Sequence, residues 1–121
     1  MKIGVPSEIK AQEFRVGLTP ASVQELTNHG HEVLIQDQAG FGAGFDNEDY
    51  SNAGAKITST AEDVFNAADM IIKVKEPLKN EVAMLSENQI LFTYLHLAAA
   101  PELTEGLIKS KAICIAYETV T

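Results

Sequence analysis

The sequence predicts an α/β fold with three layers, in which a mostly parallel sheet is flanked by helices. Two observations lead to this fold class. Short apolar runs alternate with amphipathic segments along the chain, and several of those segments carry the residues that begin and end helices. Strands that alternate with helices form parallel sheets with both faces covered. With 121 residues, the chain is expected to form one domain at most.

The predicted strands are six short runs rich in apolar residues. They lie at residues 2–6, 31–36, 55–58, 69–75, 89–95 and 111–118. In the fourth run, the apolar residues are followed by Lys73 and Lys75 before Pro77 ends regular pairing. A strand that has reached the surface is a simple explanation for terminal lysines, so the run alone leaves their role open.

The predicted helices lie between these runs. The clearest begins with Thr19 as N-cap and Pro20 at the first helical position, and it ends at Gly30. A second begins at Asp46 and stops at Gly54, and a third has a capping box from Ser59 to Glu62. Apolar residues at helical spacing predict two more, within residues 78–88 and 100–110.

Composition limits the partners. A net charge of −8 with only nine Lys and Arg residues argues against nucleic acid as a partner. Cys114 is the single cysteine, so no intrachain disulfide and no cysteine-based metal site is expected, as in a reducing compartment. The chain has no apolar signal core and no apolar run near 18 residues, so we expect a cytoplasmic protein without a membrane span.

Three ionisable residues are candidates for a site at the carboxyl ends of the strands, where ligands bind in this fold class. Lys75 closes the fourth predicted strand, His96 follows the fifth, and Arg15 lies in the polar loop after the first. An imidazole beside a lysine can exchange protons near neutral pH, and a guanidinium can bind a carboxylate through two hydrogen bonds. A structural histidine and a solvent-facing arginine are simpler readings of the same residues.

The glycines of residues 39–45 do not form a nucleotide fingerprint. Gly40, Gly42 and Gly44 have the spacing GxGxG rather than GxGxxG, and Asp46 at the start of the next helix would repel a phosphate. A flexible turn is the better interpretation.

Five segments carry a resemblance to a known family: "GVPSEIKAQEFRVGLTPASVQEL", "GFDNEDY", "VKEPL", "ILFTYLHLAA" and "AYETV". In this order and at this spacing, they resemble the N-terminal part of the alanine dehydrogenases, which belong to a group that also includes the proton-translocating nicotinamide nucleotide transhydrogenases. The resemblance runs from Met1 to Thr121. The transhydrogenases usually have "VNAP" and "FIWPAQ" where this chain has Lys75 and His96, so these two residues favour the dehydrogenase branch.

The resemblance implies roles for the three candidates. Arg15 and Lys75 would bind the carboxylate of pyruvate or L-alanine, and His96 would transfer a proton at the oxygen or nitrogen of the reacting carbon. Roles for Lys73, Glu13 and Tyr94 stay open. Gln12 departs from the Asn that is usual in the family, which affects only the detail of the Arg15 loop.

The resemblance also implies that residues 1–121 form the N-terminal segment of the Rossmann- or flavodoxin-like substrate domain of a two-domain dehydrogenase. The NAD-binding Rossmann domain and a further catalytic Asp would lie outside this chain, and the whole enzyme would be a homo-oligomer, commonly a hexamer. The alternatives are the corresponding lobe of a transhydrogenase-like relative and a non-catalytic module that binds small carboxylates.

Overall fold

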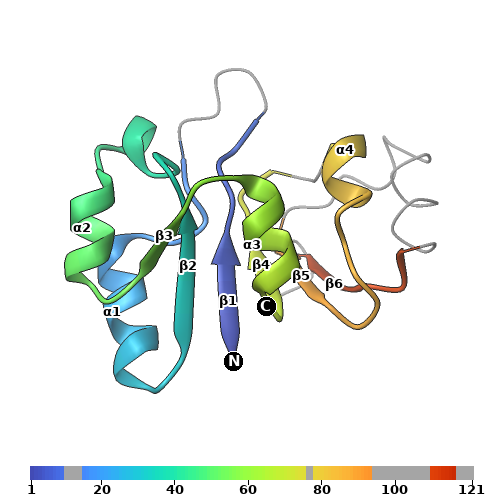
Figure 1. Cartoon of the computed structure of the whole chain (residues 1–121), viewed down its shortest axis with the longest axis horizontal. Coiled ribbons are helices and arrows are strands. Elements are labelled where there is room, and N and C mark those ends of the chain that lie inside the picture. The colour runs from blue at the N-terminus through green and yellow to red at the C-terminus, as the bar shows by residue number, and fades with distance from the viewer. Residues whose placement is uncertain (10–14, 76–77, 94–109, 117–121) are drawn as a thin grey trace.

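The computed structural model describes residues 1–9, 15–75, 78–93 and 110–116 (Figure 1). It contains a sheet of six strands in the order β3-β2-β1-β4-β5-β6. Every neighbouring pair is parallel. The strands are β1 (Lys2–Val5), β2 (Glu32–Gln36), β3 (Lys56–Thr58), β4 (Met70–Ile72), β5 (Ile90–Thr93) and β6 (Ile113–Ala116). The predicted fold class and all six predicted strand positions are confirmed.

In the described part of the chain, four α-helices and one short 3₁₀ helix connect the strands. They are α1 (Pro20–Asn28), η1 (Phe41–Ala43), α2 (Asn47–Asn52), α3 (Ala61–Ala67) and α4 (Lys79–Val82). The predicted start of α1 is confirmed, because the Thr19 side chain accepts a hydrogen bond from the Ser22 N–H and Pro20 opens the helix. Asp46 caps α2 as predicted.

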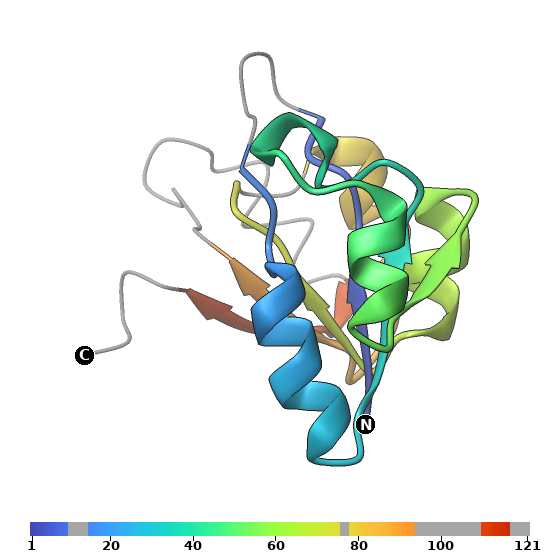
Figure 2. The ribbon, with the colours of Figure 1, turned by 90° about the vertical axis from the view of Figure 1, so that its left-hand side faces the viewer.

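The helices cover both faces of the sheet. Val23 of α1 and Tyr50 of α2 pack with Ile3, Val33 and Ile72 in one core. The other core contains Val64 and Phe65 of α3 together with Ile71 and Leu91. Alternate residues of β4, Ile71 and Ile72, thus serve opposite faces, as the alternation of side chains along a strand requires. Figure 2 shows α1 and α3 on opposite sides of the strands.

The close packing of α3 on the sheet depends on Gly4 in β1. A Cβ atom at this position would lie 2.6 Å from Cγ1 of Val64 and 2.8 Å from Cβ of Ala68. Any larger residue would push α3 away from the central strand, and the sheet would lose part of its cover.

Several predicted boundaries were wrong. Thr60, not Ser59, is the N-cap of α3, and its hydroxyl oxygen accepts from the Asp63 N–H, so the capping box from Ser59 to Glu62 does not form. The fourth strand ends at Ile72, so Lys75 lies beyond the strand rather than at its end. The predicted helix at 78–88 is a single turn, α4. The helix predicted at 100–110 lies almost wholly outside the described residues.

Within the described part of the chain, no helix combines the length and the apolar character needed to cross a membrane.

Candidate functional site

The centre of the sheet contains the point where the strand order reverses. The chain passes from β1 outward to β2 and β3, and then returns to β4 on the other side of β1. Helices and loops diverge at such a point and leave a crevice beyond the carboxyl ends of the two strands, where ligands bind in open α/β sheets. The segments that follow β1 and β4 are therefore the first place to look for a site.

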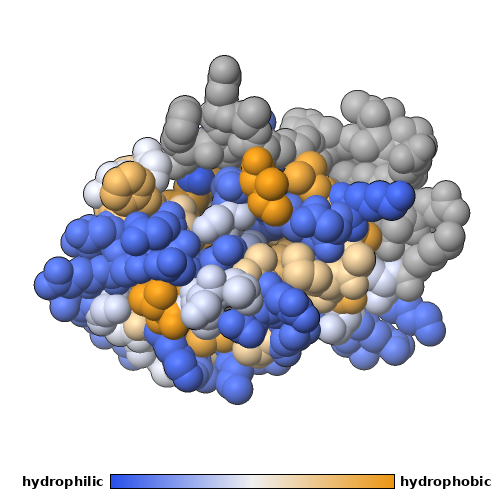
Figure 3. Space-filling view, turned by 45° about the horizontal axis from the view of Figure 1, so that its top comes forward, coloured by the Kyte–Doolittle hydropathy of each residue, from blue (hydrophilic) through white to orange (hydrophobic). Residues whose placement is uncertain are grey.

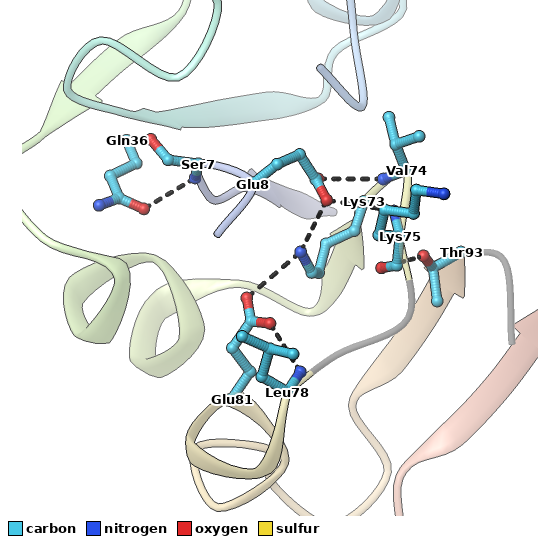
Figure 4. Close-up of polar contacts among 9 residues, drawn as sticks. All are labelled: Ser7, Glu8, Gln36, Lys73, Val74, Lys75, Leu78, Glu81 and Thr93. Atoms are coloured by element: carbon cyan, nitrogen blue, oxygen red, sulfur yellow. Dashed lines mark hydrogen bonds and ion pairs between the residues drawn. The ribbon is translucent and has the colours of Figure 1, made fainter. Parts of the chain in front are cut away.

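Glu8 follows β1 and connects it to the segment after β4 (Figure 4). Its Oε1 atom accepts hydrogen bonds from Nζ of Lys73 at 3.0 Å and from the Lys75 N–H at 3.1 Å. Its Oε2 atom accepts from the Val74 N–H at 3.0 Å. One carboxylate thus binds three donors that belong to three consecutive residues.

Lys73 is the centre of a buried charge network. Its side chain is 1% exposed, and Nζ lies 3.0 Å from Oε1 of Glu8 and 3.3 Å from Oε2 of Glu81 in α4. The Glu81 contact is an ion pair without the geometry of a hydrogen bond, whereas Oε1 of Glu81 accepts from the Leu78 N–H at 2.9 Å. A buried ammonium with two carboxylate partners is not available to a ligand, so Lys73 has a structural role.

Lys75 has a different environment. Its side chain is partly exposed, and Figure 4 shows it directed away from the carboxylates of Glu8 and Glu81. Its main chain is held on both sides, because its N–H donates to Glu8 and its carbonyl oxygen accepts from Oγ1 of Thr93 at 2.8 Å. The backbone of Lys75 is therefore fixed, while its ammonium group points away from the buried charges.

Arg15 lies near the same edge. A Cβ atom on Gly17, two residues along, would lie 2.5 Å from the carbonyl oxygen of Ile72, so this segment passes directly over the end of β4. The Arg15 side chain is exposed. The structure thus brings the segments of Arg15 and Lys75 to the carboxyl end of one strand. His96, the third predicted site residue, lies outside the described residues.

Figure 3 tilts this edge of the sheet toward the viewer, and the described surface in that view mixes hydrophilic residues with scattered hydrophobic ones.

The glycine-rich segment after β2 does not fit the pyrophosphate of a dinucleotide. It forms the 3₁₀ turn η1, and a Cβ atom on Gly40 would lie 2.5 Å from the ring of Tyr50. Gly40 therefore makes room for the ring of Tyr50 rather than for a ligand. The segment is a turn, as predicted, but Gly40 is needed there for close packing and not for flexibility. The N-terminus of α2 already holds the capping box of Asp46 and Asp49, which occupies the donors that a phosphate would need. This glycine-rich segment thus offers no cradle for a pyrophosphate.

Glu8, Glu81 and Thr93 were not among the predicted site residues. The sequence does indicate that Lys73 needs a partner, because a lysine next to a buried apolar run must either reach the solvent or pair with a carboxylate. Nothing in the sequence identifies which of the 17 acidic residues supplies that partner, since Glu8 lies 65 residues away.

The parallel sheet and its central reversal of strand order define the class: an open α/β domain, in which ligands commonly bind beyond the carboxyl ends of the strands. Within that class, the chain belongs to the family described as "Alanine dehydrogenase/PNT, N-terminal domain", whose model matches residues 4–121.

Similar proteins agree with this family. The chain is 54% identical over 121 residues to an alanine dehydrogenase from Halomonas elongata and 55% identical over 120 residues to one from Methanococcus maripaludis. Its structure matches 98% of the chain to a solved L-alanine dehydrogenase, with a TM-score of 0.95 and 55% identity. A transhydrogenase from Sinorhizobium meliloti, at 24% identity and a TM-score of 0.92, shares the fold over the whole chain.

The chain spans about a third of the length of these relatives, 33% of the Halomonas protein and 33% of the solved L-alanine dehydrogenase. The family assignment therefore concerns this domain, which corresponds to residues 4–121.

Proposed function

We propose that this chain is the substrate-binding lobe of an NAD-dependent alanine dehydrogenase, which catalyses the reversible oxidative deamination of L-alanine to pyruvate and ammonia. The observation that carries the proposal is the extent of the similarity, because 54% identity covers all 121 residues of the chain rather than one motif. Similarity of this kind includes the loops beyond the strands, where this fold class places its ligands.

In this proposal, Lys75 and Arg15 bind the carboxylate of pyruvate or L-alanine. Two cations on either side of a carboxylate form charge-assisted hydrogen bonds, which are stronger than neutral ones. They also orient the small substrate, so that its central carbon has one position in the site. The fixed backbone of Lys75 and the passage of the Arg15 segment over Ile72 support this assignment.

His96 is proposed as the catalytic residue. An imidazole changes its charge near neutral pH, so it can donate a proton to the substrate oxygen or accept one from the substrate nitrogen. Support comes from its position in the sequence, three residues after the end of β5.

The cofactor and the assembly belong to the longer enzyme that we propose. NAD would bind in another part of that enzyme, because the glycine-rich segment after β2 does not fit a pyrophosphate. We also propose that residues 1–121 form the N-terminal segment of the substrate domain. We further propose a cytoplasmic homo-oligomer, a hexamer by resemblance to the family, without nucleic acid or membrane partners.

The test is NAD-linked oxidation of L-alanine, measured by steady-state kinetics on the longer protein in which this chain is the N-terminal third. We expect activity with L-alanine and, in reverse, with pyruvate and ammonia. The isolated chain serves as the control and should be inactive. If the longer protein binds pyruvate but does not turn it over, the chain is a carboxylate-binding module, and the proposed function is wrong.

A further inference from the structure

We infer that Glu8 and Thr93 are positioning residues that hold the main chain of Lys75, and through it the ammonium group that binds the substrate carboxylate. This inference rests on the proposed function. Neither residue needs to touch the substrate, because each acts on the peptide groups of Lys75.

The need for these contacts follows from the end of β4. The strand stops at Ile72, and the last ladder bond beyond it joins the Lys73 N–H to the carbonyl oxygen of Phe92 at 3.1 Å. Val74 and Lys75 lie beyond the end of β4, where the pairing with β1 has stopped. Their N–H groups therefore do not bind to a neighbouring strand. The carboxylate of Glu8 accepts from both, at 3.0 and 3.1 Å, and takes the place of a neighbouring strand.

Glu8 is itself held in position. The preceding residue, Ser7, donates its N–H to Oε1 of Gln36 at the end of β2, at 2.8 Å. Lys73 supplies the charge that makes burial of the Glu8 carboxylate possible, since both side chains are 3% exposed or less. The loop after β1 is therefore fixed on one side to β2 and on the other side to the segment after β4.

Thr93 completes the arrangement from the opposite direction. It is the last residue of β5 and is fully buried. Its hydroxyl group donates to the carbonyl oxygen of Lys75 at 2.8 Å. The N–H of Lys75 is thus bound from the side of β1 and its carbonyl group from the side of β5.

The substitution Glu8→Gln tests the first contact, because an amide has one acceptor oxygen and cannot accept from all the donors that surround Glu8. Thr93→Val tests the second contact without changing charge or shape. Glu81→Gln is the matched control: it also removes one carboxylate from Lys73, but Glu81 binds the Leu78 N–H and not the main chain of Val74 or Lys75. All three are made in the longer enzyme, with KM for pyruvate, KM for NADH and the thermal midpoint measured for each.

We expect Glu8→Gln to raise KM for pyruvate about tenfold or more, because a small misplacement of a binding group has effects of that size. Thr93→Val should raise the same KM by about threefold to tenfold for loss of one neutral hydrogen bond. KM for NADH should change less than about twofold in both variants. Glu81→Gln should lower the thermal midpoint without raising KM for pyruvate.

Two results would overturn the inference: an unchanged KM for pyruvate in Thr93→Val, or an equal rise in Glu8→Gln and Glu81→Gln, which would mark a general effect of the buried charges. If Glu8→Gln does not fold, Thr93→Val decides alone. Absence of alanine oxidation in the unmodified enzyme is a separate result, which removes the proposed function instead.

Discussion

The ammonium group of Lys73 lies 3.0 Å from Oε1 of Glu8, although the two residues are 65 positions apart in the sequence. Both side chains are almost completely buried, and Glu81 contributes a second carboxylate at 3.3 Å from the same nitrogen. Charges that leave water need compensation within the protein. The three side chains therefore depend on one another, and the removal of the single cation should have the largest effect.

Replacement of Lys73 by Met should destabilise the chain by about 3–5 kcal/mol, because the two buried carboxylates of Glu8 and Glu81 lose the ammonium group that they share. The free energy of unfolding in urea measures this effect. Lys79→Met is the control, since Lys79 is exposed and a surface change of this kind stays within about 0.5 kcal/mol. Equal stability of the two variants would mean that the buried network contributes little to folding.

Replacement of Lys75 by Ala should weaken substrate binding and lower turnover in the longer enzyme. A carboxylate that loses one of its two cations loses both energy and orientation, so kcat/KM for pyruvate should fall about 100-fold or more. Stability should change little, because Lys75 is only partly buried and its main-chain hydrogen bonds remain. Retention of full activity in this variant would exclude Lys75 from the site.

His96→Ala should lower kcat across the pH range with a smaller effect on KM for pyruvate, since the proposed imidazole transfers a proton rather than binding the carboxylate. The pH profile of kcat measures this. A variant that keeps the activity and the pH profile of the original enzyme would remove His96 from the mechanism.

Replacement of Gly17 by Ala should displace the segment that carries Arg15. The new Cβ atom would lie 2.5 Å from the carbonyl oxygen of Ile72, which is backbone and cannot turn away. We expect KM for pyruvate to rise about tenfold. Gly44→Ala is the control, because its Cβ atom would meet no neighbour and only its φ of +93° is unfavourable, at about 1–2 kcal/mol of stability. A similar KM in both variants would contradict the placement of Arg15 at the site.

Tyr50 should make the stability of the chain fall at alkaline pH. Burial, and to a smaller extent the charge of Asp49, raises the pKa of Tyr50 to about 12 from 10.0. Above pH 10 the folded state then keeps a proton that the unfolded state releases, whereas below pH 10 the ionisation of Tyr50 does not change the stability. Between pH 10 and pH 12 this residue should lower the free energy of unfolding by about 1.4 kcal/mol per pH unit.

Tyr50→Phe isolates that effect. At pH 7 the variant should be less stable by about 1–3 kcal/mol, because the Tyr50 hydroxyl donates to the carbonyl oxygen of Leu18 at 2.7 Å. Between pH 10 and pH 12 the difference between the two proteins should shrink, as only the original protein contains the titrating group. A difference that stays constant to pH 12 would show that Tyr50 ionises as easily in the folded state as in the unfolded one.

The sequence was sufficient for the fold because its signals are local. Thr19 and Pro20 mark the start of α1, and apolar runs of a few residues mark each strand. The ends of the helices were harder to predict, because neighbouring residues such as Ser59 and Thr60 can both serve as an N-cap. Tertiary packing decides between them.

The candidate site was only partly accessible from sequence. Lys75 is indicated by its place at the end of a predicted strand and Arg15 chiefly by the resemblance to the family, and the structure brings their segments to the carboxyl end of β4. The partners of Lys73 could not be selected, because pairing of Glu8 with Lys73 depends on the order of the strands. That order is a property of the whole sheet, and no local pattern encodes it.

The order of the strands has a consequence for folding. Residues 2–58 supply β1, β2 and β3, whereas residues 70–116 supply β4, β5 and β6, and the two halves meet where β1 pairs with β4. Contacts between distant segments form slowly, because closing the long loop between them costs conformational entropy before the contacts stabilise the chain. We therefore expect each half to gain structure first and the contacts of Glu8 with residues 73–75 to form late. The proposed carboxylate site takes Arg15 from the first half and Lys75 from the second, so binding of pyruvate would report that both halves have joined.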